Sequence, residues 1–299
     1  MINVPLNLGN DKKCLIIDAN ALMHRAYYAL PRLKDKQGKL VNAIYGFLAC
    51  LLKILRDQNP QYVVAVFDSP GKTFRHLEYP LYKATRTKTP DEFYAQFPET
   101  KEILKFLGIP VLEKIGYEAD DLIGAMAHKV KDPKTKVLIL TGDFDLLQLV
   151  NTQVNVLLLR KGVSQTALYN TNKTREKLGG LAPKKILDFK GLAGDSSDNI
   201  PGVPGVGPKT TLTLLQKFGS LEEIYTQMDK KTEEIKPSLK IKLQKFRDQA
   251  FLSKKLATLK TDMKLDLSVA KCSRAGYNKT KVVEILEGLG FNTLIARLP

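Results

Sequence analysis

The sequence predicts an α/β fold with a mostly parallel central sheet flanked by helices, followed by a helical region. Short apolar runs, most of them ending in an acidic residue or followed by one within three residues, alternate with segments whose apolar residues recur at helical spacing. Strands that alternate with helices in this way are typical of parallel sheets. The 299 residues are enough to bury a full core. We divide the chain into an α/β core over residues 1–180 and a helical region over 181–299.

The apolar runs predict four buried strands, which are Cys14–Asp18, Tyr62–Phe67, Lys136–Leu140 and Val154–Leu159. The helical spacing predicts helices over Val41–Leu55, around Ile103–Leu107 and from Glu118 to about Val130, and the chain from about Thr171 reads as mainly helical, most clearly over Leu239–Leu256 and Lys281–Leu289. We find no internal repeat and no low-complexity tract.

The stretch Gly191–Gly219 combines two features. Its first half contains Asp195 and Asp198 and is so rich in Gly and Pro that we expect a loop. Its second half is a glycine turn that leads into a helix beginning at Pro208 and ending before Gly219. The free N–H groups at such a helix start bind phosphate. Acids beside a phosphate-binding turn indicate chemistry on a phosphate backbone.

The overall charge and the cysteines narrow the class of protein. Lys and Arg number 47 against 31 Asp and Glu, which gives a net charge of +16 and favours a polyanionic partner. The three cysteines are isolated, which fits a reducing cytoplasm and disfavours both disulfides and a zinc site. Residues Met1–Lys13 lack the pattern of a signal peptide, and no apolar segment approaches the length of a membrane span. We therefore expect a cytoplasmic protein without membrane contact.

Acidic residues follow the predicted strands, where the carboxyl ends of parallel strands form the site in such folds. Each acid has a local alternative as a turn residue, a helix cap or a charge that complements a helix N-terminus. Taken together, these alternatives explain the pattern poorly, because nine acids would gather at one sheet edge of a basic protein. The nine are Asp18, Asp68, Glu118, Asp120, Asp121, Asp143, Asp145, Asp195 and Asp198.

Crowded carboxylates raise one another's pKa unless a cation neutralises them. Oxygen ligands without His or Cys favour Mg²⁺ or Mn²⁺ over zinc. Two such ions about 3.5–4 Å apart clamp a phosphodiester during hydrolysis. Without these nine acids the chain has 31 − 9 = 22 acids against 47 bases, a surplus of +25. A negative pocket in so positive a chain predicts a metal-dependent nuclease.

A long insertion follows Asp68 and interleaves aromatic with basic residues over 74–97. This composition suits single-stranded nucleic acid, in which the rings stack on bases and the cations bind phosphate. Pro80 and Pro90 prevent one continuous helix. The alternative is a surface helical hairpin whose aromatic residues pack on the core. That alternative does not explain the basic residues Arg75, Lys83 and Arg86 beside a predicted metal site.

Several ordered motifs give the chain a family resemblance over about residues 13–298. They are Leu15–Asp18, Val66–Asp68, Thr73–Arg75, Tyr82–Ala84 with Arg86, Gly116–Asp121, Thr141–Asp143 with Asp145, and Gly194–Lys209. In this order the motifs resemble the 5′-nuclease family, which includes the flap endonucleases and the 5′→3′ exonuclease domain of bacterial DNA polymerase I. We expect a stand-alone member of this family.

The resemblance implies a site with two or more Mg²⁺ ions, for which Mn²⁺ substitutes. The first ligand group would be Asp18, Asp68, Glu118, Asp120 and Asp121, and the second Asp143, Asp145, Asp195 and Asp198. Residues of about 71–100 would form a helical arch over the site. Lys83, Arg86 and Arg75 would have catalytic roles there, with Lys83 and Arg86 steering the scissile phosphate. The products would carry a 5′-phosphate and a 3′-hydroxyl.

The resemblance also implies a DNA-binding helix–turn–helix that contains Gly202–Lys209 and holds duplex DNA through its backbone, with a K⁺ ion at its loop. The implied DNA-binding residues are Arg25, Tyr82, Gly202, Val203, Gly205, Val206, Gly207, Lys209 and Thr210. The chain departs from the family at Phe144 and Ser196, where relatives often carry a basic residue, and at Ala19–Asn20. We expect weaker phosphate contacts at Phe144 and Ser196.

The function that follows is 5′→3′ exonuclease and flap endonuclease activity on DNA, in primer removal during replication and in repair. The expected substrates are flapped, nicked or 5′-ended duplexes, including RNA-primed ones. We expect a monomer with a DNA polymerase as partner. Two alternatives remain: a structure-specific DNA-binding homologue without catalysis, and an RNA-directed nuclease. The complete set of acids disfavours the first alternative, and the duplex-binding glycine loop disfavours the second.

Overall fold

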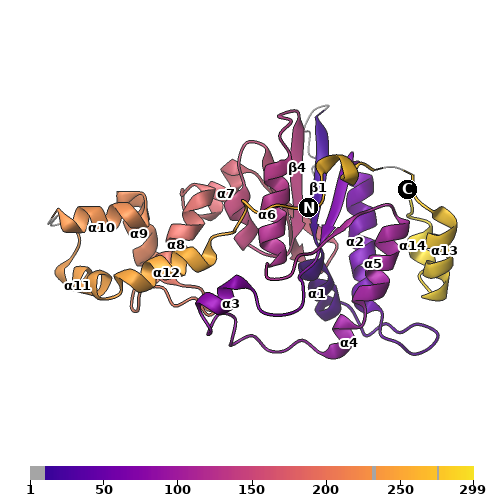
Figure 1. Ribbon diagram of the computed structural model, residues 1–299, viewed down its shortest axis with the longest axis horizontal. Coiled ribbons are helices and arrows are strands. Elements are labelled where there is room, and N and C mark those ends of the chain that lie inside the picture. Colours follow the sequence, from indigo (N-terminus) through magenta and orange to yellow (C-terminus); the bar gives the residue numbers. More distant parts are fainter. Residues whose placement is uncertain (1–10, 231–233, 275) are drawn as a thin grey trace.

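The computed structural model describes residues 11–230, 234–274 and 276–299 (Figure 1). The expectation about a signal peptide, and the first ten residues of the predicted core, lie outside the described residues. The fold consists of a sheet covered by helices on both faces, with a further group of helices at one end (Figure 1). Across the described residues, every helix falls short of the length or apolar character that a bilayer crossing needs.

The sheet has six strands in the order β3-β2-β1-β4-β5-β6. Their bounds are β1 Lys12–Asp18, β2 Tyr62–Val66, β3 Val111–Leu112, β4 Thr135–Thr141, β5 Val154–Lys161 and β6 Gln165–Tyr169. All neighbours pair in parallel except β5 and β6, which form an antiparallel hairpin. The expectation of a mostly parallel sheet is therefore confirmed. The sequence analysis missed β3, which has only two residues, and β6, which has one fully buried residue.

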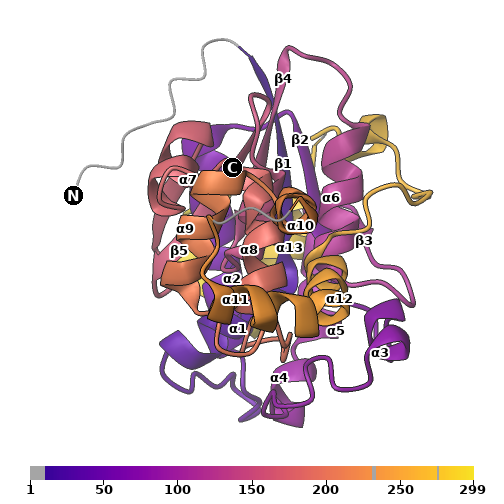
Figure 2. The same cartoon turned by 90° about the vertical axis from the view of Figure 1, so that its left-hand side faces the viewer.

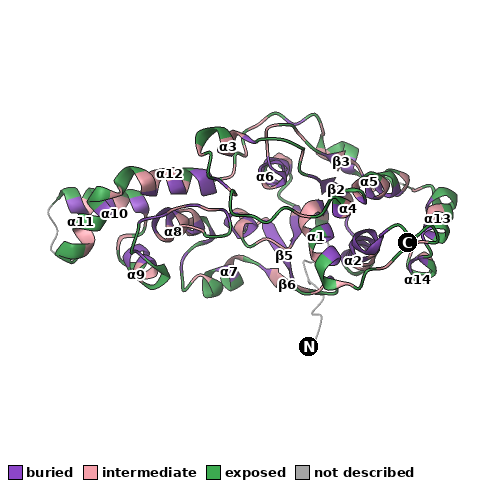
Figure 3. Ribbon diagram, turned by 90° about the horizontal axis from the view of Figure 1, so that it is seen from below, coloured by how far each residue is buried: buried purple, intermediate pink, exposed green. Residues whose placement is uncertain are grey.

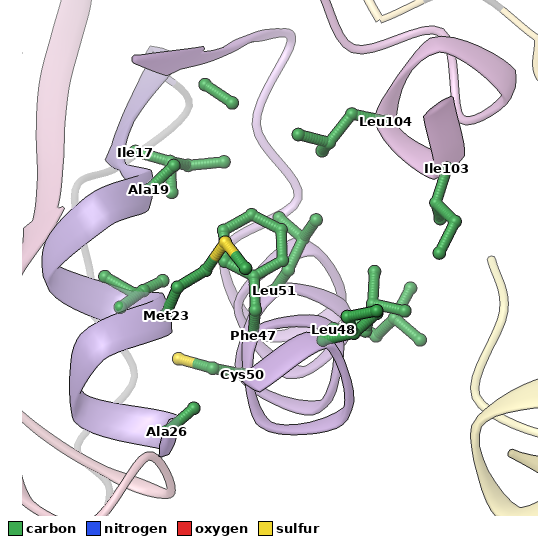
Figure 4. Close-up of a cluster of buried hydrophobic side chains, with 14 of the residues drawn as sticks. Ile17, Ala19, Met23, Ala26, Phe47, Leu48, Cys50, Leu51, Ile103 and Leu104 are labelled. Carbon is green, nitrogen blue, oxygen red and sulfur yellow. The ribbon is translucent and has the colours of Figure 1, made fainter. Parts of the chain in front are cut away.

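The two faces of the sheet contact different helices because side chains alternate along a strand. In β1, Leu15 and Ile17 join the apolar cluster beneath α1 (Ala19–Ala29), α2 (Asn42–Gln58) and α5 (Phe97–Phe106). Figure 4 shows part of this cluster, with Phe47 of α2 facing Met23 of α1. Cys14 and Ile16 join the second cluster, beneath α6 (Ala119–Lys129). Figure 3 shows that the buried faces of α2 and α6 are turned toward the sheet.

The predicted insertion over residues 71–100 is mostly not helical. It contains α3 (Phe74–Glu78), α4 (Asp91–Tyr94) and the start of α5, while residues 79–90 form turns and extended chain. The expectation of a helical arch is corrected accordingly, because Pro80 and Pro90 interrupt helical hydrogen bonding at both ends of this segment. Figures 1 and 2 show the insertion running below the sheet, where β1 leads into α1.

The core segment ends with α7 (Thr171–Lys177). The helical region then begins with α8 (Ile186–Ala193), α9 (Pro208–Phe218), α10 (Leu221–Asp229), α11 (Pro237–Lys245) and α12 (Arg247–Ala257). The predicted start of a helix at Pro208 and its stop before Gly219 are confirmed. Two expectations are corrected. Residues 191–193 belong to α8 and not to the loop, and the predicted helix Leu239–Leu256 is interrupted at Phe246, whose backbone leaves the helical conformation. Short 3-10 helices occur at Asp145–Leu149, Pro183–Lys185 and Val269–Cys272.

The last two helices return to the sheet. After α12 the chain leads to α13 (Lys279–Gly288) and α14 (Asn292–Ile295), which lie beside α2 and α5 at the end of the molecule opposite α9–α11 (Figure 1). Val282, Leu286 and Leu294 are buried in the same cluster as the apolar face of α2. By its packing, this part of the predicted 181–299 region belongs with the sheet layer.

Candidate metal centre and nucleic-acid cleft

The carboxyl ends of three parallel strands place acids at the floor of one cavity. Asp18 is the last residue of β1, Asp68 follows β2 by two residues, and Asp143 follows β4 by two residues. The cavity has a volume of about 1350 Å³. Seven of the nine predicted acids line it: Asp18, Asp68, Glu118, Asp120, Asp143, Asp145 and Asp195. The expectation that acids from distant segments meet at this sheet edge is thus confirmed for these seven.

Hydrogen bonds hold the floor carboxylates in place. Asp18 accepts the N–H of Ala21 at 3.0 Å and the hydroxyl of Thr141 at 2.6 Å. Asp68 accepts the N–H of Ala119 at 2.7 Å. Asp143 accepts the N–H of Asp145 at 2.8 Å. Each carboxylate therefore keeps a fixed orientation, with oxygens directed by the backbone of its own or a neighbouring element.

The crowding shifts the protonation of these acids. Burial is the largest cause that raises the pKa of Asp18, to about 7, and the charges of Asp68 and Asp143 add to it. Burial, followed by the charges of Asp143 and Asp18, raises the pKa of Asp120 well above its ordinary value. A site in which carboxylates resist ionisation attracts a cation, because the cation removes the cost of their mutual repulsion.

A second group of acids lies beside the first. Asp145, Asp195 and Asp198 each offer a carboxylate oxygen, and these oxygens lie within 4.8 Å of one another. The donors are all carboxylates, which fits a hard divalent cation such as Mg²⁺. The ammonium of Lys190, on α8, lies between Asp145 and Asp195 and is 2.5 Å from Asp195 Oδ2. Lys190 thus places a positive charge within the group.

Lys190 affects its two partners differently. Burial raises the pKa of Asp145 to about 6, although the charge of Lys190 opposes this. Burial also acts to raise the pKa of Asp195, but the charge of Lys190 and the hydrogen bonds from Lys190 and Ser197 outweigh it and lower that pKa to about 2. Asp195 is therefore the more readily ionised carboxylate of the two.

Two predicted site residues form a buried ion pair behind the cavity lining, where Arg75 Nη1 also lies 3.4 Å from Oε2 of the lining residue Glu118. Arg75 is 1% exposed, and its two terminal nitrogens each lie 2.8 Å from an oxygen of Asp121, which is fully buried. Arg75 also donates to the carbonyls of Leu256 and Thr258. Neither Arg75 nor Asp121 lines the cavity. The assignments of Arg75 as catalytic and of Asp121 as a metal ligand are corrected: the pair ties α3 to α6 and to the end of α12.

The insertion supplies the basic wall of the cavity. Lys83 and Arg86 line it, and Lys83 Nζ lies 3.0 Å from Glu118 Oε1. Arg86 Nη2 lies 2.5 Å from Asp198 Oδ1. Lys83 has a φ of 55°, unusual for a residue with a side chain, and its N–H donates to the carbonyl of Asp198 at 2.9 Å. This backbone contact keeps the two cations against the acids.

Tyr82 is buried and not available to DNA, which corrects its assignment as a DNA-binding residue. Its side chain is 3% exposed, and its hydroxyl lies 3.1 Å from Glu118 Oε2 and 3.2 Å from Asp198 Oδ2. Asp198 itself does not line the cavity. Its carboxylate accepts from both Tyr82 and Arg86 and so links the insertion to the glycine loop.

The glycine loop divides into a structural and an accessible part. Gly202 has a φ of +60°, and an added Cβ would lie 2.2 Å from the nitrogen of Gly194. Its N–H donates to Ser253 and its carbonyl accepts from Gln249, so the assignment of Gly202 as a DNA contact is corrected. The side chains of Val203 and Val206 are each 3% exposed and pack in the apolar cluster of the helical region.

The accessible part lies at the start of α9. Within the described residues, the N–H groups of Gly205, Gly207, Lys209 and Thr210 have no hydrogen-bond partner. Lys209 is exposed. These groups match the predicted phosphate-binding helix start. The remaining predicted DNA contact, Arg25 on α1, lines the acidic cavity instead.

Comparison with known protein families accounts for nearly the whole chain. Residues 13–179 match the model of the 5′-3′ exonuclease N-terminal resolvase-like domain, and residues 181–280 match that of the 5′-3′ exonuclease C-terminal SAM fold. The chain belongs to the 5′-3′ exonuclease family. The two matches adjoin at residue 180, and the division of the chain into two domains stays a prediction.

The curated relatives of this 5′-3′ exonuclease family member are longer proteins. It is 42% identical to DNA polymerase I of Bacillus subtilis over 287 residues, which cover 96% of this chain and 32% of the relative. It is 46% identical to DNA polymerase I of Mycobacterium bovis over 217 residues, which cover 72% of this chain and 24% of the relative. The chain thus spans about a third or less of the length of these relatives. The expectation of a stand-alone protein stays a prediction.

Solved structures share the fold of this exonuclease family member at low identity. The T5 5′-exonuclease with bound zinc superposes with a TM-score of 0.69 at 18% identity, covering 96% of this chain and 97% of that one. The catalytic core of Rad2 in complex with DNA substrate gives 0.63 at 17% identity, covering 97% and 92%. Flap endonuclease-1 from Methanococcus jannaschii gives 0.59 at 18% identity, covering 96% and 90%.

The sequence analysis of this chain missed several residues at the site. Lys190 carries no recognisable pattern among 47 basic residues, and only the packing of α8 brings it to Asp145. Asn20, noted only as a departure from the family, accepts the N–H of Asp68 at 3.0 Å. Thr141 was part of a quoted motif, and its hydroxyl bridges Asp18 and the N–H of Asp143. A hydroxyl or amide beside a strand-end acid is the signal that would have indicated such supporting roles.

Proposed function

We propose that the chain is a metal-dependent 5′→3′ exonuclease and structure-specific flap endonuclease. It hydrolyses DNA phosphodiesters and leaves a 5′-phosphate and a 3′-hydroxyl. The observation that carries this proposal is the cavity, whose floor holds seven carboxylates and whose wall holds Lys83 and Arg86. Membership in the 5′-3′ exonuclease family supports the same reaction.

The carboxylates would hold Mg²⁺ ions, with Mn²⁺ as a substitute, in two groups. The first is Asp18, Asp68, Glu118 and Asp120, and the second is Asp143, Asp145, Asp195 and Asp198. All-oxygen donors and the raised pKa values of Asp18, Asp120 and Asp145 support this assignment. When bound, such ions activate water and stabilise charge on the phosphate. The chain's contribution is to keep the carboxylates oriented through Ala21, Thr141 and Ala119.

The basic wall would bind the scissile phosphate. In the described structure Lys83 is paired with Glu118 and Arg86 with Asp198. A phosphate that enters the cavity offers each cation a second partner at the same position, so little side-chain entropy is lost on binding. Arg75 and Tyr82 act as positioning residues that fix the insertion carrying these cations.

The glycine loop would bind duplex DNA through the free N–H groups at the start of α9 and through Lys209, with a K⁺ ion held at the loop. The substrates are flapped, nicked and 5′-ended duplexes, including RNA-primed ones, and the role is primer removal and repair. We propose a cytoplasmic monomer that works with a DNA polymerase. The net charge of +16 and the likeness to DNA polymerase I support a DNA partner.

The test uses the full chain with a 5′-labelled flap duplex, a blunt duplex and single strands. Cleavage of the flap with Mg²⁺, and none with EDTA, is the expected result. Tight binding of the flap without cleavage in Mg²⁺ would make the chain a non-catalytic DNA-binding protein instead. Cleavage restricted to RNA substrates would make it an RNA-directed nuclease.

A further inference from the structure

Phe144 is an exposed aromatic residue in the acidic cavity. It lies between Asp143 and Asp145 in sequence, lines the cavity with them, and is 44% exposed. Its backbone precedes the short 3-10 helix Asp145–Leu149, whose Leu146 and Leu147 are buried. The chain therefore buries the apolar residues that follow and leaves the Phe144 ring at the cavity surface. An exposed ring among charged groups offers a flat apolar face to a ligand.

One basic residue lies beside this ring, and two more contact the neighbouring ring of Tyr169. The ammonium of Lys177, on α7, lies 5.5 Å from the centroid of the Phe144 ring. The ring of Tyr169, on β6, meets Phe144 edge-on with centroids 6.4 Å apart. Lys173 Nζ lies 5.3 Å from the Tyr169 ring, and Arg160 donates to the Tyr169 hydroxyl at 3.0 Å. Rings and cations are thus neighbours from the cavity outward, on β5, β6 and α7.

The rings and the cations of this patch differ in exposure. Tyr169 is 2% exposed and so serves as a fixed support behind Phe144. Arg160, Lys173 and Lys177 are exposed. Within the described ranges, none of these three cations lies at ion-pair distance from a carboxylate. They are available to an anionic ligand, unlike Lys83 and Arg86, which already have acidic partners.

An exposed ring beside unpaired cations matches the chemistry of single-stranded nucleic acid, because the ring stacks on a base and the cation binds phosphate. We propose that Phe144 and Lys177 form a nucleotide subsite at the rim of the cavity. The Phe144 ring stacks on one unpaired base, and Lys177 binds the phosphate next to it. This inference rests on the proposed nuclease function and names where one nucleotide of the substrate strand lies.

The subsite also explains how the chain tolerates Phe144 where a basic residue was expected. The positive charge comes from Lys177 on another element, while position 144 supplies stacking. A base can stack on Phe144 only when it is not stacked within a duplex, so the subsite favours a frayed or single-stranded nucleotide near the cut. Stacking of this kind accepts any base, which suits an enzyme that recognises structure and not sequence.

The first experiment locates the stacked base with the full chain in EDTA, which prevents cleavage. 2-Aminopurine is placed at successive positions near the 5′ end of a flap duplex, and an abasic site is placed at the same positions in a second series. We expect quenching at one position and a loss of affinity of roughly 5-fold or more when that base is removed, since stacking on one ring accounts for such a factor.

Phe144→Ala should abolish the quenching and make Kd insensitive to the abasic site. Ile115→Ala is the matched control, because Ile115 is 83% exposed and lies outside the cavity lining. That control should respond to the abasic site as the unmodified protein does. A Phe144→Ala variant that retains both the quenching and the abasic penalty would overturn the subsite.

The second experiment tests the cation through the salt dependence of DNA binding. Lys177→Gln should reduce the slope of log K against log salt by about one ion, whereas Arg175→Gln, on the same helix but without a ring contact among the described residues, should not. Phe144→Lys should increase the slope while losing the response to base removal. Equal slopes for Lys177→Gln and the unmodified protein would overturn the role of Lys177.

The outcomes distinguish the two proposals. If the unmodified chain cleaves flaps with Mg²⁺ but Phe144→Ala behaves like Ile115→Ala, the subsite fails and the nuclease function stands. If the unmodified chain neither cleaves nor binds the flap duplex, the nuclease function fails and the subsite fails with it.

Discussion

Asp18 illustrates how much one side chain does in this structure. It ends β1, caps α1 through the N–H of Ala21, accepts from Thr141 on β4 and lines the cavity. Its position follows from the sequence, because a buried strand ending in an acid places that acid at the sheet edge. Its raised pKa does not, because it depends on Asp68 and Asp143, which come from other strands.

The metal assignment predicts a large loss of turnover in Asp143→Asn. The amide oxygen can still accept the N–H of Asp145, so the fold should be kept. Loss of a residue that only hydrogen-bonds to a metal ligand already lowers metal affinity or activity by about 10–100-fold. Loss of a ligand itself should therefore lower kcat by at least roughly 100-fold. The measurements are steady-state cleavage of a flap duplex and its Kd in EDTA, which should not weaken. Unchanged turnover would remove Asp143 from the ligand set.

The crowded acids predict that the metal-free protein loses stability as the pH rises. Asp18 in the folded chain has a pKa of about 7 against an ordinary 3.8, so the unfolded chain releases this proton at lower pH. The contribution of Asp18 to the free energy of unfolding is therefore fully present below about pH 4, and it is lost as the pH rises to about 7. Asp18→Asn should raise Tm in EDTA at pH 8 and have less effect at pH 5.

Thermal unfolding at both pH values checks this expectation. The control is Asp132→Asn, at an exposed aspartate whose pKa is lowered by hydrogen bonds from the Lys134 N–H and the Thr135 hydroxyl. Its contribution has the opposite sign and is lost as the pH falls, so this variant should not gain stability at pH 8. An Asp18→Asn protein no more stable than the original at pH 8 would contradict the argument.

Among the elements, the insertion owes its position to buried polar contacts more than to its own helices. α3 has five residues and α4 four, too short to be stable alone. Arg75 fixes α3 against α6 and α12, and Tyr82 and Lys83 fix the turn beyond it against Glu118 and Asp198. The wall that faces the acids is therefore attached at several points within a few residues.

Breaking the Arg75–Asp121 ion pair should strongly destabilise the fold. Arg75→Gln leaves the Asp121 carboxylate buried without its charged partner and should lower the free energy of unfolding by about 3–5 kcal/mol. Lys88→Gln, in an ion pair whose side chains are 81% and 87% exposed, is the matched control and should change it by about 1 kcal/mol or less. Urea unfolding measures both. Similar small losses in the two variants would contradict the structural role of Arg75.

The start of α9 should bind DNA mainly through the phosphates of its backbone. Lys209→Ala should weaken duplex binding by a similar factor for every sequence and reduce the salt dependence by about one ion, because Lys209 is exposed and offers charge without base contacts. Binding titrations of several duplexes at a series of salt concentrations test this. A loss confined to one sequence would indicate base recognition instead.

At the scale of the whole molecule, the last residues of the chain complete the core that begins with β1. α13 and α14 cover one side of the sheet layer, and the helical group formed by α9–α11 lies at the other end of the molecule (Figure 1). The two halves of the site are joined across this arrangement, because Lys190 and Asp195 from the helical region meet Asp145, which begins the 3-10 helix after β4.

This arrangement predicts that substitutions in the C-terminal helices lower the stability of the protein but leave its cleavage activity near normal. Leu286→Ala and Leu294→Ala remove side chains that are 1% and 0% exposed, and each should lower the free energy of unfolding by about 2–5 kcal/mol. Flap cleavage at low temperature should remain near normal, since neither residue lines the cavity. Denaturant unfolding and cleavage assays on the same preparations test both parts. A loss of kcat without a loss of stability would contradict this separation.

The sequence by itself determined the features that depend on short-range periodicity and on strand ends. The buried strands, the parallel sheet, the helix at Pro208 and seven acids at one sheet edge were all predictable, because strand and helix periods are local and parallel strands end on one side. The nonhelical insertion was partly signalled by Pro80 and Pro90.

Only the tertiary structure decided which charged groups meet. Arg75 lies 46 residues from Asp121, Lys190 lies 45 from Asp145, and Lys177 reaches Phe144 from another element. Such pairs depend on how α3, α7 and α8 pack, and no local period encodes that packing. For this reason Arg75 and Asp121 turned out to be a buried ion pair, and Lys190 and Phe144 proved to be parts of the cavity and its surroundings.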